Sequence, residues 1–409
     1  MLMLVVASAR GERYHSDLIT SSVQQHHSSD VTPHQVLSSH SQKQQHQQQQ
    51  LPFNLVTVDM VDILWSSLNQ TAGNRTYARS SMCAACSRGF TLLRFATLPF
   101  WPNDVRSALV TDPDIYWSAL DGVIEDAKGC GCFLLATLFW NVFAVPDVYN
   151  ESLGSVISAD PNSSSRARAA QDSYISAITA RYSSDPTIAV WETVNEMNLY
   201  FDLNMSQQQP CISPPSGSPS MRTLADNVST AVSLVWQARV AGLIKQHDPL
   251  KRPISSGHSV MRPDAKWLRE NYANSNPPPR TLDTRDEFIN ASISSALGCD
   301  WMSLHLYPGA DCARWGETNT YSTVVAEAGL EAAQTADLVF HFGEFGDNLQ
   351  TSPQRNFTKA VLNTLSTWPR GNWIASVWDW MLLQQTDTFS IFPDRDAEII
   401  ADMIAFNNR

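Results

Sequence analysis

The sequence predicts an α/β fold, a (β/α)8 TIM barrel that follows a low-complexity N-terminal tail. Apolar runs of strand length recur eight times, and a stretch with helical spacing follows each of them. The ends of successive strands lie roughly 35 to 60 residues apart, which suits βα units with some enlarged loops. A doubly wound open sheet is the rival architecture. No Gly-x-Gly-x-x-Gly turn follows the first strand, so the barrel is favoured.

The predicted strands are nearly continuous runs of β-branched, aromatic and leucine residues. Such runs are typical of parallel strands that are buried on both faces, because helices cover one face and the barrel interior the other. We place the eight strands at 53–58, 90–97, 132–141, 187–196, 252–257, 300–307, 337–345 and 373–381.

The segments between these strands have apolar residues at the spacing of an amphipathic helix. This pattern is what the outer ring of a barrel requires, with one face of each helix packed on the strands. We place helices at 77–88, 114–128, 165–182, 223–247, around 264 and 285, and at 321–335, 352–367 and 396–406.

The composition divides the 409 residues into a tail and one large domain. Residues 1–50 are rich in Gln, Ser and His and include six of the ten histidines. Such a segment buries too little apolar surface to offset its ordering entropy, so we expect it to be disordered. Metal binding by His26 and His27 is the less favoured reading. We expect residues 51–409 to form one large folded domain.

The charge and hydropathy of the chain exclude several classes of function. A net charge of −12 argues against nucleic-acid binding, which needs a basic surface. No apolar run is long enough for a transmembrane helix, so no membrane partner is expected. Thirteen Trp and ten Tyr residues suit stacking on sugar rings, although Trp also fills large cores.

Several features suggest secretion. Residues 1–9 are apolar and end in an Ala-x-Ala pattern, as in a short signal peptide, but lack a basic start. Asn-x-Ser/Thr sequons are also frequent, and none falls in a predicted strand. They begin at Asn69, Asn74, Asn150, Asn162, Asn204, Asn227, Asn290 and Asn356.

Polar side chains occur where the predicted strands end. In a barrel of this type the chemistry lies at the C-terminal ends of the strands, so these side chains should converge. One such residue means little, whereas residues from six strands are hard to explain by structure alone. They are Arg94, Asn141, Asn195, Glu196, His305, Tyr307, Glu344 and Trp378.

Two of these residues form a candidate catalytic pair. Hydrolysis of a glycosidic bond uses two carboxyl groups from different positions, and Glu196 and Glu344 lie on the fourth and seventh strands. Glu192 is no partner for Glu196, because four residues along a strand span roughly 13 Å. Gly343 and Gly346 flank Glu344 and are expected to leave room for a ligand. A gap of about 5 Å between the carboxyls indicates retention of anomeric configuration, and a wider gap indicates inversion.

These motifs resemble those of glycoside hydrolase clan A, most of all family 5, the cellulase and β-mannanase group. The resemblance covers roughly residues 52–406 and rests on the order and spacing of several loose motifs. They are the Arg94 strand, the octapeptide 191–198 (WETVNEMN), His305-Leu-Tyr307, Gly343-Glu344-Phe-Gly346 and Trp378.

The resemblance implies roles for the catalytic pair and its nearest supports. Glu196 is the implied general acid/base and Glu344 the implied nucleophile. Asn195 is implied to hold the sugar 2-hydroxyl. Tyr307 is implied to hydrogen-bond Glu344, and Arg94 to keep Glu344 ionised.

The resemblance also implies that His305 orients Glu196 or a sugar hydroxyl, and that Trp378 is the platform under the sugar. One departure follows the third strand, where cellulases usually have a His and this chain has Trp140-Asn141. Asn141 is closer to the mannanase branch and is a candidate sugar contact. Trp140 is a candidate stacking residue.

Structural alternatives stand beside these roles. Arg94 could serve only a buried ion pair, and His305 could be a core histidine. Glu192 could be a support inside the barrel or purely structural. Trp378 is preferred to Trp380 as the platform. Asp379 is a rival carboxylate, expected to point away from the face that the two Trp residues share.

Seven cysteines suit an oxidising compartment and leave one unpaired. The end of the first helix and the start of the third strand both lie at the bottom of a barrel. We therefore expect disulfides between Cys83 or Cys86 and Cys130 or Cys132, and disfavour a zinc site there. Cys211 and Cys312, in loops at the opposite end, could form another.

The sequence thus predicts a secreted, monomeric, retaining glycoside hydrolase without a cofactor. Its expected substrate is a β-linked polysaccharide of the β-1,4-mannan or β-1,4-glucan type. The loops 200–221 and 309–320 are expected to shape the cleft. A catalytically silent carbohydrate-binding barrel is the alternative, and the presence of both carboxylates argues against it.

Overall fold

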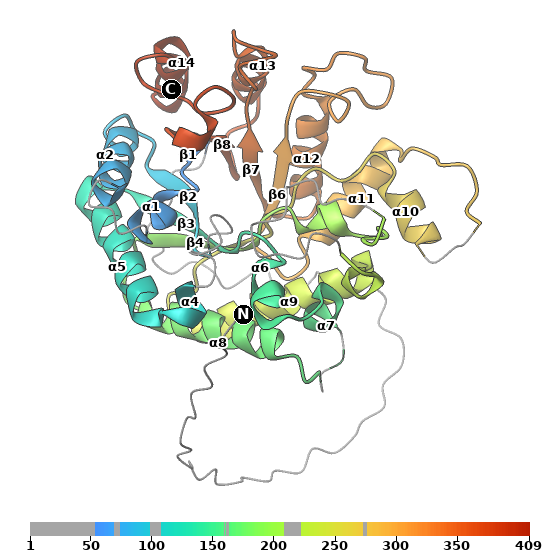
Figure 1. Cartoon of the computed structure of the whole chain (residues 1–409). Coiled ribbons are helices and arrows are strands. Elements are labelled where there is room, and N and C mark those ends of the chain that lie inside the picture. The colour runs from blue at the N-terminus through green and yellow to red at the C-terminus, as the bar shows by residue number, and fades with distance from the viewer. Residues whose placement is uncertain are drawn as a thin grey trace, which may run out of the picture. The chain divides into compact units, whose positions relative to one another are not determined.

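The computed structural model describes residues 54–68, 74–98, 108–158, 160, 163–207, 222–272 and 276–409. Its eight parallel strands close into a barrel in sequence order, β1 to β8, with helices around it (Figure 1). The predicted (β/α)8 fold is confirmed. The strands are β1 Leu55–Asp59, β2 Leu92–Ala96, β3 Phe133–Phe139, β4 Ile188–Val194, β5 Ile254–Ser255, β6 Trp301–Leu306, β7 Val339–Phe345 and β8 Trp373–Val377.

Each predicted helix is found, and short helices add to them in the loops. One prediction, a helix over 223–247, is wrong at its start. Thr223 caps the 3-10 turn Leu224–Asp226, and Ser229 separately caps α9 through the backbone N–H of Val232. The helices are α1 Ile63–Leu68, α2 Asn74–Cys86, α4 Ala108–Thr111, α5 Pro113–Cys130, α6 Ala144–Tyr149, α7 Leu153–Ile157, α8 Arg166–Arg181, α9 Thr230–His247, α10 Ala265–Asn271, α11 Arg285–Ser295, α12 Val324–Thr335, α13 Asn356–Leu365 and α14 Ala397–Asn407.

The barrel interior changes from apolar to polar along its axis, because alternate residues of each strand point inward. At the N-terminal ends of the strands an apolar plug contains Leu55, Leu92, Leu135, Val190, Trp301 and Ile374. Two residues further along the same strands, the buried side chains are polar. They include Thr57, Arg94, Thr137, Glu192, Ser303 and Ser376. The plug supports this polar layer from below.

The larger apolar core lies between the strands and the helices. Several tryptophans fill this core or the barrel interior. Trp191, Trp236, Trp301 and Trp380 are fully buried. Filling the core therefore accounts for several tryptophans without a role in ligand binding.

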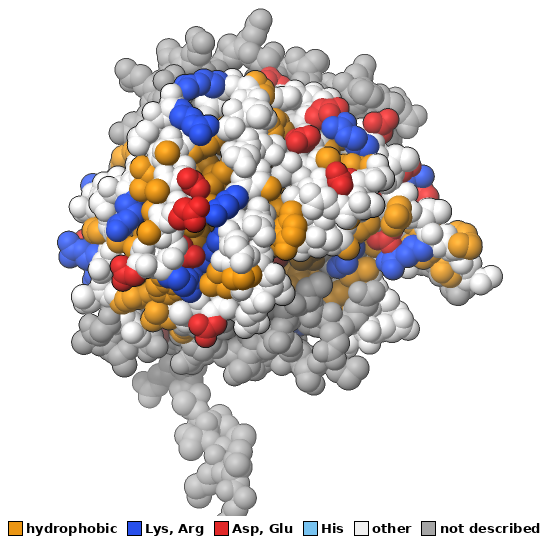
Figure 2. Space-filling model, turned by 90° about the horizontal axis from the view of Figure 1, so that it is seen from above, with side chains coloured by type: hydrophobic (Ala, Val, Ile, Leu, Met, Phe, Trp, Pro, Cys, Tyr) orange, Lys and Arg blue, Asp and Glu red, His pale blue; other side chains and the backbone are white. Residues whose placement is uncertain are grey.

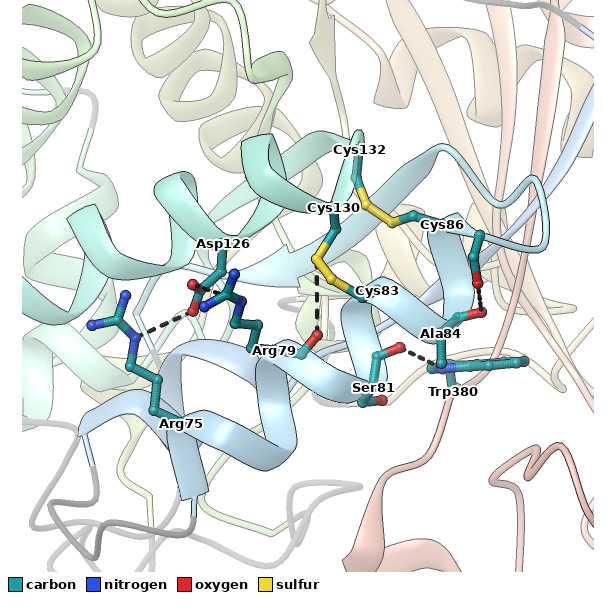
Figure 3. Close-up of a disulfide and its surroundings, with 11 residues drawn as sticks. Arg75, Arg79, Ser81, Cys83, Ala84, Cys86, Asp126, Cys130, Cys132 and Trp380 are labelled. Atoms are coloured by element: carbon teal, nitrogen blue, oxygen red, sulfur yellow. Dashed lines mark hydrogen bonds and ion pairs between the residues drawn. A yellow bond between two sulfur atoms is a disulfide. The ribbon is translucent and has the colours of Figure 1, made fainter.

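Two disulfides join the end of α2 to the end of α5 and the start of β3 (Figure 3). They are Cys83–Cys130 and Cys86–Cys132, so the predicted pairing between the two groups is confirmed. Asp126 adds ion pairs to the same junction, at 3.2 Å from Arg75 and 3.6 Å from Arg79. The junction is thus held covalently and by charge.

We expect the two disulfides to make overlapping, non-additive contributions to the free energy of unfolding. Their cysteines are separated by 47 and 46 residues, so both close almost the same loop of the unfolded chain. Replacing all four cysteines by Ser should lower the free energy of unfolding by about 4 kcal/mol. Replacing one pair should cost much less than half of that, because the other pair still closes the loop. Urea denaturation of the two double variants and the quadruple variant measures this. Equal and additive losses would contradict it.

The other cysteine prediction involves Cys312. This residue is buried, forms no disulfide among the described residues, and donates its thiol to the carbonyl of Tyr307 at 3.2 Å. Its predicted partner, Cys211, lies outside the described residues. The same holds for the tail 1–50, for the signal peptide at 1–9 within it, for Asn69 and Asn162, and for most of the loop 200–221.

Within the described chain, every helix is too short or too polar to cross a lipid bilayer. On the face drawn in Figure 2, Lys and Arg side chains are interspersed with Asp and Glu rather than gathered into one basic field.

Candidate active site

The strand-end residues converge at the C-terminal end of the barrel. Arg94 lies in β2, His305 in β6 and Glu344 in β7. Asn195 and Glu196 directly follow β4, and Tyr307 follows β6. All of these are linked by hydrogen bonds or ion pairs into one cluster. The structure therefore brings together residues that are up to 250 positions apart in the sequence.

Arg94 is the centre of this cluster. Its guanidinium is 1% exposed and donates from three nitrogens to three side chains, two from β4 and the turn after it and one from β7. Nε binds Glu192 at 2.7 Å, Nη1 binds Glu344 at 2.8 Å, and Nη2 binds the amide oxygen of Asn195 at 2.7 Å. Burial alone would lower the pKa of Arg94, but the surrounding carboxylates raise it above its ordinary value. The guanidinium is therefore always charged.

Glu192 is a support inside the barrel and lies below the candidate catalytic pair. It is fully buried and accepts hydrogen bonds from Arg94 and from the hydroxyls of Thr137 at 2.7 Å and Ser255 at 2.9 Å. Burial would raise its pKa, but Arg94 and a hydrogen bond with His341 hold it well below the ordinary value. Glu192 therefore stays ionised and partly neutralises the charge of Arg94 on the side facing the barrel interior.

Glu344 receives two direct donors. One carboxylate oxygen accepts from Arg94, and the other accepts from the Tyr307 hydroxyl at 2.7 Å. Burial raises the pKa of Glu344 above its ordinary value and the charge of Glu196 acts in the same direction, while His305, Arg94 and Tyr307 oppose this rise without cancelling it. The two donors thus favour the ionised form of this carboxyl group.

Glu196 sits at a turn with a left-handed backbone conformation, φ 52°. Its backbone N–H donates to the carbonyl of Gly257 at 2.8 Å, and its side chain lies 3.1 Å from Nδ1 of His305. Burial raises the pKa of Glu196, against the weaker opposing effects of Ser259 and Arg94. Its side chain is 18% exposed, so it remains in reach of a ligand.

Gly257 holds the turn of Glu196 in place through a close approach of two backbones. A Cβ at this position would lie 1.6 Å from the carbonyl oxygen of Val194, and its φ of +71° disfavours other residues. We expect Gly257→Ala to lower the free energy of unfolding by about 3 kcal/mol or more. If Glu196 is catalytic, the displaced turn should also lower kcat by roughly 100-fold.

Gly371→Ala is the matched control, because a Cβ there meets no atom within 4 Å. Thermal unfolding and steady-state kinetics of both variants test the expectation. Equal behaviour of the two variants would contradict the role given to Gly257.

His305 lies between the two carboxyl groups. It is fully buried, with Nδ1 3.1 Å from Glu196 and 3.3 Å from Glu344. Burial lowers its pKa to about 4, so it is neutral at neutral pH. Ligand atoms of His305, Glu196 and Glu344 all lie within 4.8 Å of one another, a spacing that could also hold a metal ion. Here Nδ1 of His305 already forms a hydrogen bond with Glu196.

Trp140, Asn141 and Trp378 lie above this cluster. The indoles of Trp140 and Trp378 stack with their centroids 5.8 Å apart, and Arg94 lies 4.6 Å from the Trp140 centroid. Asn141 is 8% exposed, and its amide oxygen accepts from the backbone N–H of Phe143. The two candidate stacking residues thus form one aromatic group over Arg94.

Two expectations near the site are corrected by the structure. β8 ends at Val377, so Trp378 and Trp380 do not share a face, and the Trp378–Asp379 peptide bond is cis. Trp380 packs outward against Phe90 at a centroid distance of 5.6 Å. The expectation for Asp379 rested on that shared face. Its side chain is fully buried and accepts a hydrogen bond from the Ser390 hydroxyl at 2.6 Å.

The flanking glycines are explained by packing and not by room for a ligand. A Cβ on Gly343 would lie 2.7 Å from Nε2 of His305, and one on Gly346 would lie 2.6 Å from the carbonyl oxygen of Trp378. Both positions therefore need Gly so that β7 can approach two other site residues.

The sequence reading missed Asp59, which ends β1. It is fully buried and lies 3.8 Å from Nη1 of Arg94. Its carboxylate oxygens have no hydrogen-bond partner among the described residues. Burial raises its pKa well above the ordinary value. Its position at a strand end is the signal that could have identified it.

No family model matches the chain. A curated relative, "Probable mannan endo-1,4-beta-mannosidase F" of Emericella nidulans, is 23% identical over 229 residues. The match covers 56% of this chain, and the chain spans less than half (44%) of the relative's length.

Solved structures with the same fold include an endo-β-1,4-mannanase of Thermotoga petrophila, with a TM-score of 0.56 and 15% identity over 87% of this chain and 77% of that chain. A family 5 mannosidase of Rhizomucor miehei has a TM-score of 0.57 and 12% identity over 86% and 92% of the two chains. An endo-1,4-β-mannanase of the same organism has a TM-score of 0.58 and 16% identity over 89% and 97%. The resemblance to glycoside hydrolase family 5 that the strand-end motifs predict is therefore confirmed, and the similar proteins are mannanases and a mannosidase.

Proposed function

We propose that the protein is a retaining glycoside hydrolase that cleaves β-linked polysaccharide, with β-1,4-mannan as the favoured substrate. The observation that carries the proposal is the pair of carboxyl groups of Glu196, just after β4, and Glu344, in β7, with oxygens within 4.8 Å of each other. Retaining glycosidases have their two carboxyls about 5 Å apart, whereas inverting enzymes need a wider gap for a water molecule.

In the first step a carboxylate oxygen of Glu344 attacks C1 of the sugar, and the C1–O bond to the leaving group breaks. The leaving oxygen takes the proton of Glu196. In the second step Glu196 removes a proton from water, whose oxygen attacks C1 and releases Glu344. Two inversions at C1 give net retention.

The hydrogen-bond donors around the pair support this division of roles. Glu344 accepts from Arg94 and Tyr307, which favour its ionised form. Glu196 has no guanidinium within hydrogen-bond distance among the described residues, and burial raises its pKa. The pKa of both carboxyl groups is raised, and two close carboxyl groups resist being ionised together. We assign the single proton to Glu196, because Glu344 is the one that accepts from the charged Arg94.

The neighbouring residues suit sugar binding. Arg94 engages the amide oxygen of Asn195, which leaves the Nδ2 group as the donor to a sugar hydroxyl. The stacked indoles of Trp140 and Trp378 suit the apolar face of a sugar ring, and Asn141 is a further candidate contact. His305, neutral and between the carboxyls, orients Glu196.

Mannan is favoured over glucan and xylan because the similar proteins are named for mannan or mannose. Secretion is favoured because two disulfides staple the domain, which suits an oxidising compartment. We propose no cofactor, since the two-carboxyl mechanism uses none.

Hydrolysis assays on β-mannan, β-glucan and xylan, with Glu344→Gln beside the native protein, test this proposal. We expect hydrolysis of β-mannan that is lost in the variant. Binding without turnover on every polymer would instead favour the catalytically silent carbohydrate-binding barrel.

A further inference from the structure

The loop that follows β8, residues 382–391, is closed at its base. We call it the β8 loop. The backbone N–H of Met381 donates to the carbonyl of Ile391 at 3.0 Å, and that of Ile391 donates to the carbonyl of Asp379 at 2.8 Å. The Ser390 hydroxyl donates to the Asp379 carboxylate at 2.6 Å and accepts from the N–H of Leu382 at 2.8 Å. The two ends of the loop are therefore fixed to each other.

Arg355 fixes the same loop to the rest of the barrel. This side chain is 4% exposed and donates to the carbonyls of Phe389 and Ser390, both at 2.7 Å. It also pairs with Asp396, just before α14, at 3.1 Å. A buried guanidinium with several acceptors is costly to move, because each contact would have to be replaced. The C-terminal part of the β8 loop is thus fixed to the barrel.

One chain of contacts runs from this loop to Glu344 through aromatic rings. The amide oxygen of Gln385 accepts from Nε1 of Trp378 at 2.9 Å. Trp378 stacks on Trp140 at 5.8 Å, and Trp140 lies 4.6 Å from the guanidinium of Arg94. Arg94 in turn donates to Glu344 at 2.8 Å.

A second chain of contacts begins at the other donor to Glu344. The Tyr307 hydroxyl donates to this carboxylate, and the Tyr307 ring packs edge-on against Phe389 at a centroid distance of 5.4 Å. Phe389 belongs to the same loop, in the part that Arg355 holds. Both donors to Glu344 are therefore supported from one short segment.

We propose that the β8 loop positions the nucleophile and the sugar platform, with Gln385 and Phe389 as its two positioning residues. Neither side chain hydrogen-bonds either carboxyl group of the pair, and each acts through a residue that contacts the site. Gln385 sets the orientation of Trp378, and Phe389 sets that of Tyr307. The inference rests on the proposed function and extends it to residues outside the strand ends.

Gln385→Leu removes the acceptor for the Trp378 indole at similar volume. We expect KM for a β-1,4-manno-oligosaccharide to rise about five- to tenfold, the effect of one lost hydrogen bond, with a smaller change in kcat. Gln385→Glu keeps a carboxylate oxygen as the acceptor and should restore KM to within about twofold of the native value. A high KM in both variants, or in neither, would overturn the role of Gln385.

Phe389→Leu loosens Tyr307 and so weakens a donor that favours the ionised form of Glu344. The acid limb of the kcat/KM profile should move to higher pH, because the nucleophile must be ionised. Tyr307→Phe should move the same limb, and the double variant should show no further shift. An unmoved limb in Phe389→Leu, or additive shifts in the double variant, would overturn the role of Phe389.

The charged and titratable groups that act on Glu344 are Asp59, Arg94, Glu196, His305, Tyr307 and Asp379.

Leu383→Ala is the control within the same loop, since this side chain is 56% exposed. It should keep native kinetics. If the native protein hydrolyses none of the polymers, the proposed function fails. If the native protein is active and both Gln385→Leu and Phe389→Leu behave like Leu383→Ala, only the inference on the β8 loop fails.

Discussion

Glu344→Gln should abolish hydrolysis, with a fall in kcat on the order of 10⁴-fold or more. The amide has the same shape but no negative charge, so it is a poor nucleophile toward C1. It also removes the carboxylate that binds Arg94 at 2.8 Å and Tyr307 at 2.7 Å. Hydrolysis of a manno-oligosaccharide, followed by product chromatography, measures the loss.

The fold should tolerate this change, because Arg94 keeps its bond to Glu192 at 2.7 Å and to Asn195. Circular dichroism and thermal unfolding are the controls. Folded protein without activity supports the assignment. Activity within about tenfold of the native enzyme would remove Glu344 from the mechanism.

Glu196→Ala should have the second largest effect, and its size should depend on the leaving group. Loss of a general acid lowers kcat by roughly 10²- to 10⁴-fold for a sugar leaving group, which needs a proton. An aryl glycoside with an acidic phenol needs no such proton, so its first step should be nearly native. The second step should then limit turnover, and added azide should accelerate it by replacing the base-assisted water.

The pH dependence of kcat/KM should further distinguish the role of Glu196 from that of Glu344. Burial raises the pKa of Glu196, and the proposed acid is active while it holds its proton. The native kcat/KM should therefore fall at high pH as Glu196 ionises, at a pH above the ordinary range of a carboxyl group. In Glu196→Ala that basic limb should disappear for the aryl glycoside. A basic limb that persists would assign the titration to another group.

Much of the barrel could be predicted because its strands are apolar on both faces. The eight runs identified the strands, and their ends indicated where polar side chains would meet. The β5 strand is shorter than expected, at Ile254–Ser255, because Pro253 has no N–H to donate and Gly257 turns the chain. The helix expected at 223–247 likewise divides at Ser229, whose side chain caps a new helix.

Other features could not be predicted because they depend on three-dimensional contacts without a periodic signature. The need for Gly at 343 and 346 follows from the approach of His305 and the Trp378 backbone. The expected position of Asp379 rested on strand alternation, which stops where β8 ends at Val377. The contacts of Gln385 and Phe389 lie in an irregular loop.

The roles of Glu196 and Glu344 remain predictions that the geometry supports, and trapping the covalent intermediate tests them most directly. A 2-deoxy-2-fluoro-mannosyl fluoride in the β configuration should inactivate the enzyme by forming a stable ester. The fluorine at C2 slows both steps, but the fluoride at C1 is a good leaving group, so the first step still occurs. Proteolysis and mass spectrometry of the inactivated protein then locate the sugar. We expect the label on the peptide that contains Glu344, with none in Glu344→Gln. A label on Glu196, Glu192 or Asp379, or a product of inverted configuration without any label, would contradict the account.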